Sequence, residues 1–317
     1  MLRLFVSIVV MTLAACSAPS DIRDSRFIMG TLVEFTVVGV DNEVATTAIS
    51  AAANEMQRIE DVFTIYGDHD NNVKLFNRSP VGTPVGLPDE VSRLLDAAQT
   101  IKKESDGAFD PSLGKLNLLW GFSLADKPVA PPTQQEIEQA APPPFCVEKQ
   151  GDAWIRLNKR CQLDFGAIAK GYAIDRGIET LKSHGIKHAI INAGGDIRLI
   201  GRHGERPWRI GIRHPRNKGE VIKSLELEGD VAVVTSGDYE RFYLFEGERY
   251  HHIINPKTGW PATGSQSATV IAENAMLADA WSTALFILND QSASIPNDLN
   301  IRMLLIDNKG NIISDML

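Results

Sequence analysis

The sequence predicts an α+β fold, on the basis of its helix-like and strand-like segments and the order in which they occur. Apolar residues recur at helical spacing over residues 45–63, 89–105, 168–184 and 274–288, which indicates four helices. Short runs rich in β-branched and aromatic residues dominate the second half and are typical of strands. Helices and strands do not alternate regularly, so a doubly wound parallel sheet is not expected.

The first half is expected to begin with a strand over residues 27–38, entered through Met29-Gly30-Thr31. The helix over residues 45–63 follows, and the helix over 89–105 ends at Asp106-Gly107. Residues 124–145 contain repeated prolines, which prevent regular structure at either end of the segment. We therefore predict a surface excursion there, with at most one short helix over residues 134–141.

The second half is expected to be rich in strands. Gly185 ends the helix over 168–184, and strands are predicted at residues 189–200, 208–213, 221–227, 232–235, 241–245 and 267–271. Asn274 is a natural N-cap for the last helix, and a hairpin of residues 303–306 and 312–314 follows it. No internal repeat is visible, so residues 27–317 are predicted to form a single domain.

The composition is that of a soluble globular protein with an acidic balance. The chain has 317 residues, with 32 Lys and Arg against 40 Asp and Glu, a formal net charge of −8, and 44% hydrophobic residues. No Lys/Arg-rich run is present, so binding to a nucleic-acid backbone is not expected.

The first 15 residues have the pattern of a signal peptide. An apolar run over residues 4–13 is too short to span a bilayer as a stable helix. Residues 13–16 (LAAC) are similar to a bacterial lipobox, in which Cys16 is acylated and residues 16–26 become a lipidated tether. We expect anchoring at the periplasmic face of a bacterial membrane, with Ser17 slightly favouring the outer membrane. A plain secretory signal is the alternative.

Two further cysteines, Cys146 and Cys161, flank a predicted turn at Gly151-Asp152. An oxidising compartment favours a disulfide across this hairpin, which the loop-entropy estimate values at about 3 kcal/mol. Two free thiols are the alternative. Neither cysteine belongs to a metal-binding Cys/His pattern.

A carboxylate lies inside the otherwise apolar helix over residues 274–288. Asp279 and Thr283 are four residues apart, so their oxygens project from one face of that helix. A carboxylate among apolar side chains has to be paired, hydrogen-bonded or bound to a metal. The pattern therefore indicates either a capped or salt-bridged core residue or an oxygen-ligand site for Mg²⁺ or Ca²⁺.

Two glycine-containing segments follow predicted strands. Residues 164–171 (DFGAIAKG) lie between a strand expected at 161–163 and a helix, where backbone N–H groups and Lys170 can hold a phosphate while Asp164 holds a polar group. Residues 192–196 (NAGGD) form a turn or a close approach to a ligand. The Walker A spacing is missing, and ordinary turns are the alternative.

A histidine pair, His251-His252, precedes a short apolar segment. A histidine beside a metal–phosphate site is a candidate general base, whereas most histidine pairs are surface residues. Serine-hydrolase motifs and the dinucleotide-binding GxGxxG pattern are absent from the sequence.

The order of these motifs resembles that of the ApbE-type FAD:protein FMN transferases. The matching segments cover nearly the whole mature chain: residues 29–31 (MGT), 107–111 (GAFDP), 120–122 (WGF), 164–175, 193–196 (AGGD), 235–241 (TSGDYER), 252–256 (HIINP) and 278–284 (ADAWSTA). The resemblance implies a T-fold-like architecture of antiparallel sheet and packed helices, with an active site in a cleft between two subregions.

The resemblance also implies an activity. Such enzymes cleave FAD in a Mg²⁺-dependent reaction, attach FMN to a Ser or Thr hydroxyl of a target protein through a phosphoester bond, and release AMP. They face the periplasm, often as lipoproteins. Their targets include membrane subunits of sodium-pumping (Nqr) and Rnf-type redox complexes.

Individual roles follow from the matched positions. His252 corresponds to the family's candidate base, and the metal ligands are the main-chain oxygen of Ala167 with the side chains of Asp279 and Thr283. The positions that line the FAD site are Met29, Tyr66, Ala108, Phe109, Asp110, Asp164, Lys170 and Ile253. Asn255 stands where many members carry Asp.

Two other functions are compatible with the same residues. A Mg²⁺-dependent FAD pyrophosphatase would use water as the acceptor and yield FMN and AMP. A non-catalytic FAD-binding lipoprotein would leave the dinucleotide intact.

Overall fold

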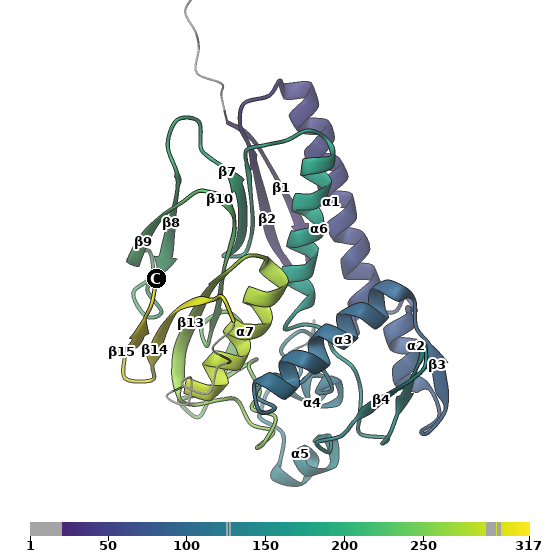
Figure 1. Cartoon of the computed structure of the whole chain (residues 1–317). Coiled ribbons are helices and arrows are strands. Elements are labelled where there is room, and N and C mark those ends of the chain that lie inside the picture. The colour runs from purple at the N-terminus through teal and green to yellow at the C-terminus, as the bar shows by residue number, and fades with distance from the viewer. Residues whose placement is uncertain (1–20, 125, 127, 290–295, 297–298) are drawn as a thin grey trace, which may run out of the picture.

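The computed structural model of the chain describes residues 21–124, 126, 128–289, 296 and 299–317 (Figure 1). The predicted signal peptide and Cys16 lie outside the described residues. Among the helices of the described part, none combines the length and apolarity needed to cross a membrane.

An eight-stranded sheet forms the centre of the molecule, with strand order β1-β2-β6-β7-β10-β13-β14-β15. Each neighbouring pair in this order is antiparallel, as the family resemblance implied. Its strands are β1 (Ile22–Ile28), β2 (Thr31–Val37), β6 (Ala189–Ala193), β7 (Asp196–Gly201), β10 (Gly229–Gly237), β13 (Ser265–Ala272), β14 (Arg302–Asp307) and β15 (Ile312–Asp315).

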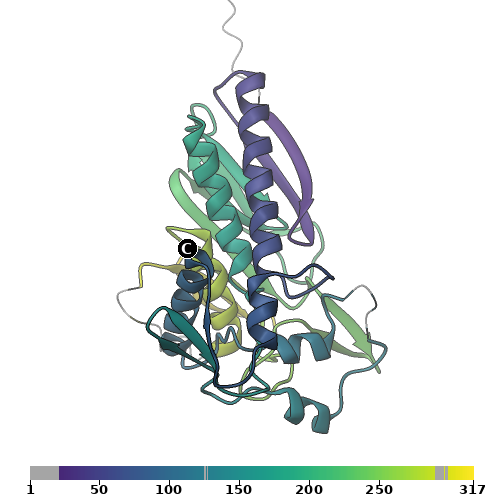
Figure 2. The ribbon, with the colours of Figure 1, turned by 90° about the vertical axis from the view of Figure 1, so that its right-hand side faces the viewer.

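Three helices cover one face of this sheet: α1 (Asn42–Phe63), α6 (Ala169–Ser183) and α7 (Ala275–Leu288) (Figures 1 and 2). Helix α6 packs against both α1 and α7, and α7 packs on β10 and β13. Their apolar residues and those of the sheet form the main core, in which Phe35, Trp281 and Phe286 are fully buried. The predicted sheet with packed helices is confirmed.

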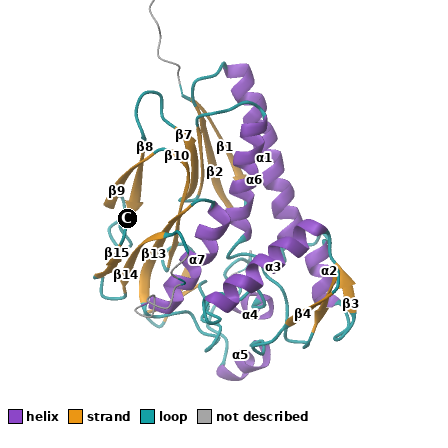
Figure 3. Cartoon of the chain, viewed as in Figure 1, coloured by secondary structure: helices purple, strands orange, loops and turns teal. Residues whose placement is uncertain are grey.

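A separate hairpin of β8 (Trp208–Arg213) and β9 (Val221–Leu227) covers part of the other face (Figure 3). Alternate residues of β8 are buried, and Trp208, Ile210 and Ile212 pack towards β7 and β10 in a second core. Both strands have the predicted boundaries, because their period-2 patterns match a strand with one buried face.

A third part of the molecule lies beyond one end of the sheet (Figure 3). It contains the remaining elements: α2 (Asn72–Arg78), β3 (Pro84–Gly86), α3 (Asp89–Glu104), α4 (Gly114–Trp120), α5 (Gln134–Ala140), β4 (Val147–Gln150), β5 (Ala153–Arg156), β11 (Phe242–Phe245) and β12 (Glu248–His251). Cys146 and Cys161 form a disulfide with a Cα–Cα distance of 5.3 Å, so the favoured pairing is confirmed.

Several expectations from the sequence are wrong at their boundaries. The polar tether predicted to extend to residue 26 ends earlier, because β1 begins at Ile22 and pairs along its whole length with β2. The strand expected over residues 27–38 is interrupted at Met29 and Gly30, whose φ angles of 57° and 66° form the β1–β2 turn. Residues 161–163 contribute an isolated bridge at Gln162 instead of a strand.

Candidate active site

Several of the predicted site residues come together where the N-terminal end of α6 meets α7 and the turns at one end of the sheet. Gly171 in the first turn of α6 sets the distance between the two helices. A Cβ atom on Gly171 would lie 2.1 Å from the Ala275 carbonyl oxygen and 2.8 Å from the Asp279 Cβ. The backbone N–H of Gly171 donates to Asp279 Oδ2 at 2.8 Å. Glycine therefore permits the contact that orients the Asp279 carboxylate.

The start of α7 is held by a second carboxylate, Asp175, which extends from α6. Its two oxygens accept the backbone N–H groups of Ala275 at 2.7 Å and Met276 at 2.9 Å. The Asn274 side chain caps the same helix by accepting from Leu277 N at 2.8 Å, as predicted. The first turn of α7 is thus fixed before the helix reaches Asp279.

Two buried carboxylates lie near one ammonium group in this region, and one of them is paired with it. Lys170 Nζ lies 2.5 Å from Asp196 Oδ2, and Asp196 and Asp279 are 3% and 4% exposed. Burial raises the pKa of Asp279 to about 7, against the attraction of Lys170. Burial opposes the charge on Lys170, but the carboxylates of Asp196 and Asp279 outweigh it and raise the pKa of that lysine. Lys170 alone does not balance the charge of these two carboxylates when both are ionised.

The residues predicted to bind a metal fit a hard cation. In a regular helix the Gly171 N–H would donate to the Ala167 carbonyl, but here it donates to Asp279. In the described part of the chain, the Ala167 carbonyl oxygen therefore accepts no backbone hydrogen bond. The Thr283 hydroxyl lies on the Asp279 face of α7 and is 3.2 Å from the Ser236 hydroxyl. These candidate metal ligands are all oxygen atoms, as Mg²⁺ and Ca²⁺ prefer. A cation bound to them would add positive charge beside the two carboxylates.

A second polar group lies on the loop before α6. Asp164 accepts from Asn117 Nδ2 at 2.7 Å and from Gly166 N at 2.8 Å, so its carboxylate is held from two sides. Burial raises the pKa of Asp164, while these donors favour its charged form. Burial also raises the pKa of Tyr66, and the neighbouring Asp164 raises it further. The structure thus brings Tyr66 and Asp164 together, as the predicted FAD-site roles require.

The GAFDP segment has a different placement. Ala108 and Phe109 are buried in the main core, and Phe109 N donates to Ser105 Oγ at 3.1 Å. Asp110 pairs with Lys102 at 2.7 Å and accepts from Ser112 N at 2.8 Å. The contacts that the structure gives these three residues are internal to the protein, and their roles in FAD binding stay predictions.

The two histidines have different environments. His251 Nε2 lies 2.7 Å from the Ala262 carbonyl oxygen, and its ring packs edge-on against Phe286, so it is a core residue. His252 Nδ1 is buried and has no hydrogen-bond partner within the described residues. Burial lowers the pKa of His252 to about 3, with Arg241 contributing next and Lys170 a smaller part. The adjacent Ile253 is 4% exposed and belongs to the main core.

Arg241 connects these groups, and the sequence analysis assigned it no role. Its guanidinium donates to Ser123 Oγ at 3.1 Å, and a Cβ on Gly30 would lie 3.6 Å from its Nη2 atom. Its charge lowers the pKa of His252 and favours the ionised form of Asp164. Met29 precedes Gly30 in the β1–β2 turn, and its backbone N–H donates to Glu60 Oε2 at 2.8 Å. Asp196 belongs to the 193–196 segment, and the sequence analysis likewise assigned it no functional role.

The arrangement can bind a polyanion and accept a proton. Lys170 and Arg241 supply positive charge, the oxygens of Ala167, Asp279 and Thr283 can hold a cation, and His252 is neutral at physiological pH because of its lowered pKa. Such a combination suits chemistry at a phosphorus atom, which depends mainly on positioning and on neutralising charge.

Comparison with known proteins agrees with this geometry. The sequence model of the ApbE family matches residues 29–303. A FAD:protein FMN transferase of Rhodobacter capsulatus is 30% identical over 94% of this chain, which spans 58% of the length of that relative. A FAD:protein FMN transferase of Salmonella typhimurium is 28% identical over 84% of this chain and 78% of its own length.

Solved structures show the same fold. The ApbE protein of Thermotoga maritima has a TM-score of 0.83 at 35% identity, covering 94% of this chain and 97% of its own. The flavin transferase ApbE of Vibrio cholerae has a TM-score of 0.79 at 27% identity, covering 91% of this chain and 94% of its own. From the length of the family match and the similarity of the folds, the chain belongs to the ApbE family.

Proposed function

We propose that this chain cleaves FAD and transfers the FMN half to a Ser or Thr hydroxyl of a target protein, releasing AMP. Its relatives carry the name FAD:protein FMN transferase. The observation that carries the proposal is the buried pair of carboxylates, Asp196 and Asp279, around the single ammonium of Lys170. Beside it lie a guanidinium and a neutral histidine, which are the groups that phosphoryl transfer to a hydroxyl requires.

In this reaction the acceptor oxygen forms a bond to the phosphorus of the FMN half. The bond between that phosphorus and the bridging oxygen breaks, AMP leaves with the oxygen, and the hydroxyl proton passes to His252. Arg241 and Lys170 both lower the pKa of His252 in the free protein. A bound diphosphate would offset these two positive charges and remove their part of the lowering, while burial, its largest cause, would remain.

The diphosphate is held by local groups, since the chain carries a formal net charge of −8. Lys170 lies in the first turn of α6, where backbone N–H groups point towards an anion. Arg241 reaches the same region from the residue before β11. Asp164 and Tyr66 are available for the polar edge and the ring face of the flavin or adenine.

Mg²⁺ is the proposed metal, held by the Ala167 carbonyl, Asp279 and Thr283. When bound, it would neutralise charge on the diphosphate oxygens as the bond to AMP breaks. No three His, Cys, Asp or Glu side chains gather around one point in the described residues, so this site depends on a single carboxylate and on mixed oxygen donors. That donor set suits Mg²⁺, which keeps several of its ligands as water or phosphate oxygens.

The cellular setting is part of the proposal. The lipobox-like segment ending at Cys16 supports a lipid anchor at the periplasmic face of a bacterial membrane, the outer membrane being slightly favoured. The proposed targets are Nqr- or Rnf-type subunits, as the family resemblance implies. An anchor in the same membrane as the target would let the enzyme reach it without diffusing through the periplasm.

Intact-mass measurement tests the function. The mature protein is incubated with FAD, Mg²⁺ and a soluble flavin-accepting domain of a sodium-pumping redox complex. We expect the acceptor to gain the mass of FMN and the same acceptor with its hydroxyl residue replaced by Ala to gain none. Free FMN and AMP with an unmodified acceptor would indicate a pyrophosphatase, and intact FAD would indicate a binding protein.

The metal assignment has its own test in the same assay. Asp279→Ala is expected to abolish Mg²⁺-dependent transfer, because it removes the only carboxylate in the proposed ligand set. Exposed Asp70→Ala, whose side chain is paired at the surface with Arg78, serves as the control and is expected to be unaffected. Full activity of the Asp279 variant would overturn the assignment.

A further inference from the structure

The β8–β9 hairpin leaves one strand edge unpaired beside the candidate active site. Within the described residues, β8 pairs with β9 and with no other strand. Its six residues run about 20 Å at the usual strand rise. An unpaired edge presents backbone N–H and C=O groups that can pair with another extended segment.

Two cavities of about 450 Å³ and 620 Å³ lie along this edge. Every residue of β8 lines one of them, and no residue of β9 lines either. The cavities share Glu34 of β2 and Asn192 of β6, so they are two parts of one trough. This trough is the space between the free edge of β8 and the outer face of β1, β2 and β6.

The floor of the trough is a sheet face that the hairpin does not cover. Leu32, Glu34 and Thr36 alternate with the buried residues of β2, so they point away from the helices. Phe27 is the cross-strand partner of Leu32, and these two apolar side chains are 76% and 52% exposed. An exposed apolar pair beside an unpaired edge is typical of a surface that binds another chain.

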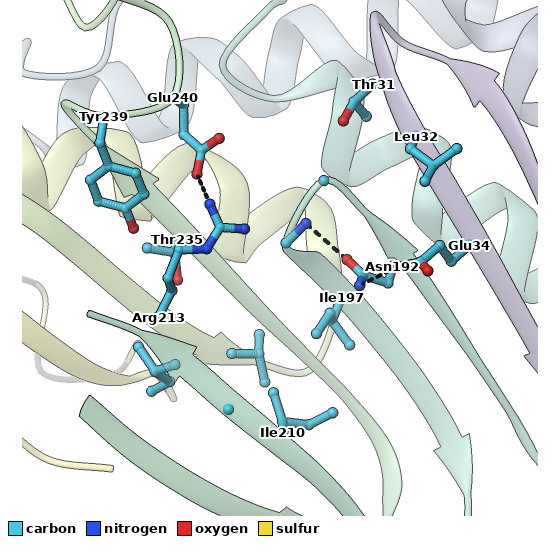
Figure 4. A pocket seen from close by; sticks show the side chains of 15 residues that line it. Thr31, Leu32, Glu34, Asn192, Ile197, Ile210, Arg213, Thr235, Tyr239 and Glu240 are labelled. Carbon is cyan, nitrogen blue, oxygen red and sulfur yellow. Dashed lines mark hydrogen bonds and ion pairs between the residues drawn. The ribbon is translucent and has the colours of Figure 1, made fainter. Parts of the chain in front are cut away.

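One end of the trough, drawn in Figure 4, is lined by residues that adjoin the candidate active site. Gly194, Gly195 and Thr235 line that end, and Asp196, which follows Gly195, pairs with Lys170. Thr235 N donates to Asp196 Oδ1 at 3.2 Å, so the lining of the trough is bonded directly to the catalytic cluster. Figure 4 shows Arg213 and Glu240, which are 3.2 Å apart, facing Asn192 and Glu34 across this end.

We propose that the trough binds the acceptor segment of the target protein, which adds to β8 as an extended strand. This inference rests on the proposed function, because that reaction needs a protein hydroxyl beside the diphosphate. Strand addition supplies affinity through main-chain hydrogen bonds and leaves alternate side chains to be read by pockets. The apolar floor at Phe27 and Leu32 and the polar groups Glu34 and Asn192 would contact those side chains. The Ser or Thr is thereby carried along β8 to the end of the trough at Gly195.

Transfer kinetics with the flavin-accepting domain of a sodium-pumping redox complex test the proposal. Thr36→Trp fills the trough at a position that belongs to no part of the catalytic cluster. We expect it to raise KM for the acceptor at least about tenfold, with the affinity for FAD unchanged. Phe27→Ser, at an exposed position where folding is little affected, is expected to raise the same KM about threefold.

The matched control is Glu226→Trp, which places the same side chain on an exposed position of β9. It is expected to leave both KM for the acceptor and the affinity for FAD unchanged. Hydrogen exchange provides the second measurement: β8 amides should become protected when FAD and the Ala-substituted acceptor are added together, and not with FAD alone.

Two results would overturn the inference. Equal acceptor KM values for Thr36→Trp and Glu226→Trp would show that the acceptor docks elsewhere. Weaker FAD binding by Thr36→Trp would assign the trough to the nucleotide. Failure of the proposed function is distinguishable from both, since the unmodified enzyme would then transfer no FMN to the acceptor domain.

Discussion

His251 and His252 are neighbours in the chain but perform different tasks in the structure. His251 is tied to the Ala262 carbonyl and to the ring of Phe286, so its contribution is to the core. His252 has a buried nitrogen without a hydrogen-bond partner in the described part of the chain. A buried polar atom without a partner costs free energy, and function is a common reason for retaining one.

His252→Ala is expected to lower kcat for FMN transfer by about 10²- to 10⁴-fold, the usual contribution of a general base. The affinity for FAD should stay the same, because in the proposed reaction His252 contacts the incoming hydroxyl and not the dinucleotide. Single-turnover transfer and FAD titration by fluorescence measure the two quantities. His251→Ala is the control and should lower thermal stability instead. Loss of FAD binding by His252→Ala would show a structural role.

At this scale the sequence supports some assignments better than others. Helical spacing alone places Asp279 and Thr283 on one face, and α7 confirms the helix that carries them. Arg241 was missed because its contacts come from distant segments: Ser123 is 118 positions away, and Gly30 lies in the first turn of the sheet. No local pattern reports such a convergence.

At the scale of elements, the packing of α6 on α7 sets the geometry of the site. Gly171 allows the α7 backbone to approach, and its N–H holds Asp279. Asp175 and Arg198 extend the arrangement, since Asp175 caps α7 while pairing with Arg198 Nη1 at 2.8 Å. The face of α7 that carries the proposed metal ligands is therefore positioned by α6 and not by α7 itself.

Gly171→Ala is expected to separate the two helices and turn the Asp279 carboxylate, because the added Cβ meets backbone atoms that cannot move alone. Overpacking of this kind costs about 1–3 kcal/mol. Mg²⁺-dependent transfer should fall more steeply than stability does, as measured by activity and denaturant unfolding. Gly177→Ala in the same helix is the control: its Cβ would meet the flexible side chains of Ile191 and Met56. Equal effects of the two substitutions would contradict this account.

Helices with strong periodicity were predicted from the sequence, whereas two of the three seven-residue helices were missed; the third, α5, was predicted because prolines flank it. Helices α1, α3, α6 and α7 have long apolar stripes, so their patterns exceed local noise. Helices α2 and α4 have seven residues each, which is too short for a periodic signal. The first residues of β1 look like part of a tether because four of its seven residues are polar and its partner strand supplies the pairing.

At the scale of the whole molecule, one ionic network joins α1 and α6 to α3. Arg58 of α1 donates to both oxygens of Glu90 on α3, at 2.7 Å and 2.8 Å, and also contacts Glu55. Tyr172 of α6 donates to Glu90 at 2.9 Å. The network links the helices of the sheet layer with the part that carries the disulfide and the Asp164 loop.

This network predicts a dependence of stability on pH. Hydrogen bonds from Arg58 lower the pKa of both Glu55 and Glu90 below the ordinary 4.5, against their partial burial. Such groups stabilise the fold above the ordinary pKa, and that stabilisation is lost as pH falls through the lowered values. Arg58→Gln should therefore be less stable than the unmodified protein at pH 7, with the difference vanishing in acid.

Denaturant unfolding at neutral pH and at several acid values measures this difference. Arg78→Gln removes an ion pair whose two side chains are 62% and 61% exposed, and it is expected to change stability little at any pH. A difference for Arg58→Gln that stays constant into acid would show that packing, and not charge, is responsible.

The length of strand β1 limits which acceptor hydroxyls an anchored enzyme could reach. This strand begins at Ile22 and ends at Ile28, so it spans about 23 Å between the point where the described chain starts and the turn at Met29. With the lipid anchor proposed at Cys16, the residues before that strand can add at most about 20 Å. The reacting centre would then lie at most about 45 Å above the bilayer. Hydroxyls on membrane-proximal loops fall inside this height, and those carried on tall periplasmic domains fall outside it.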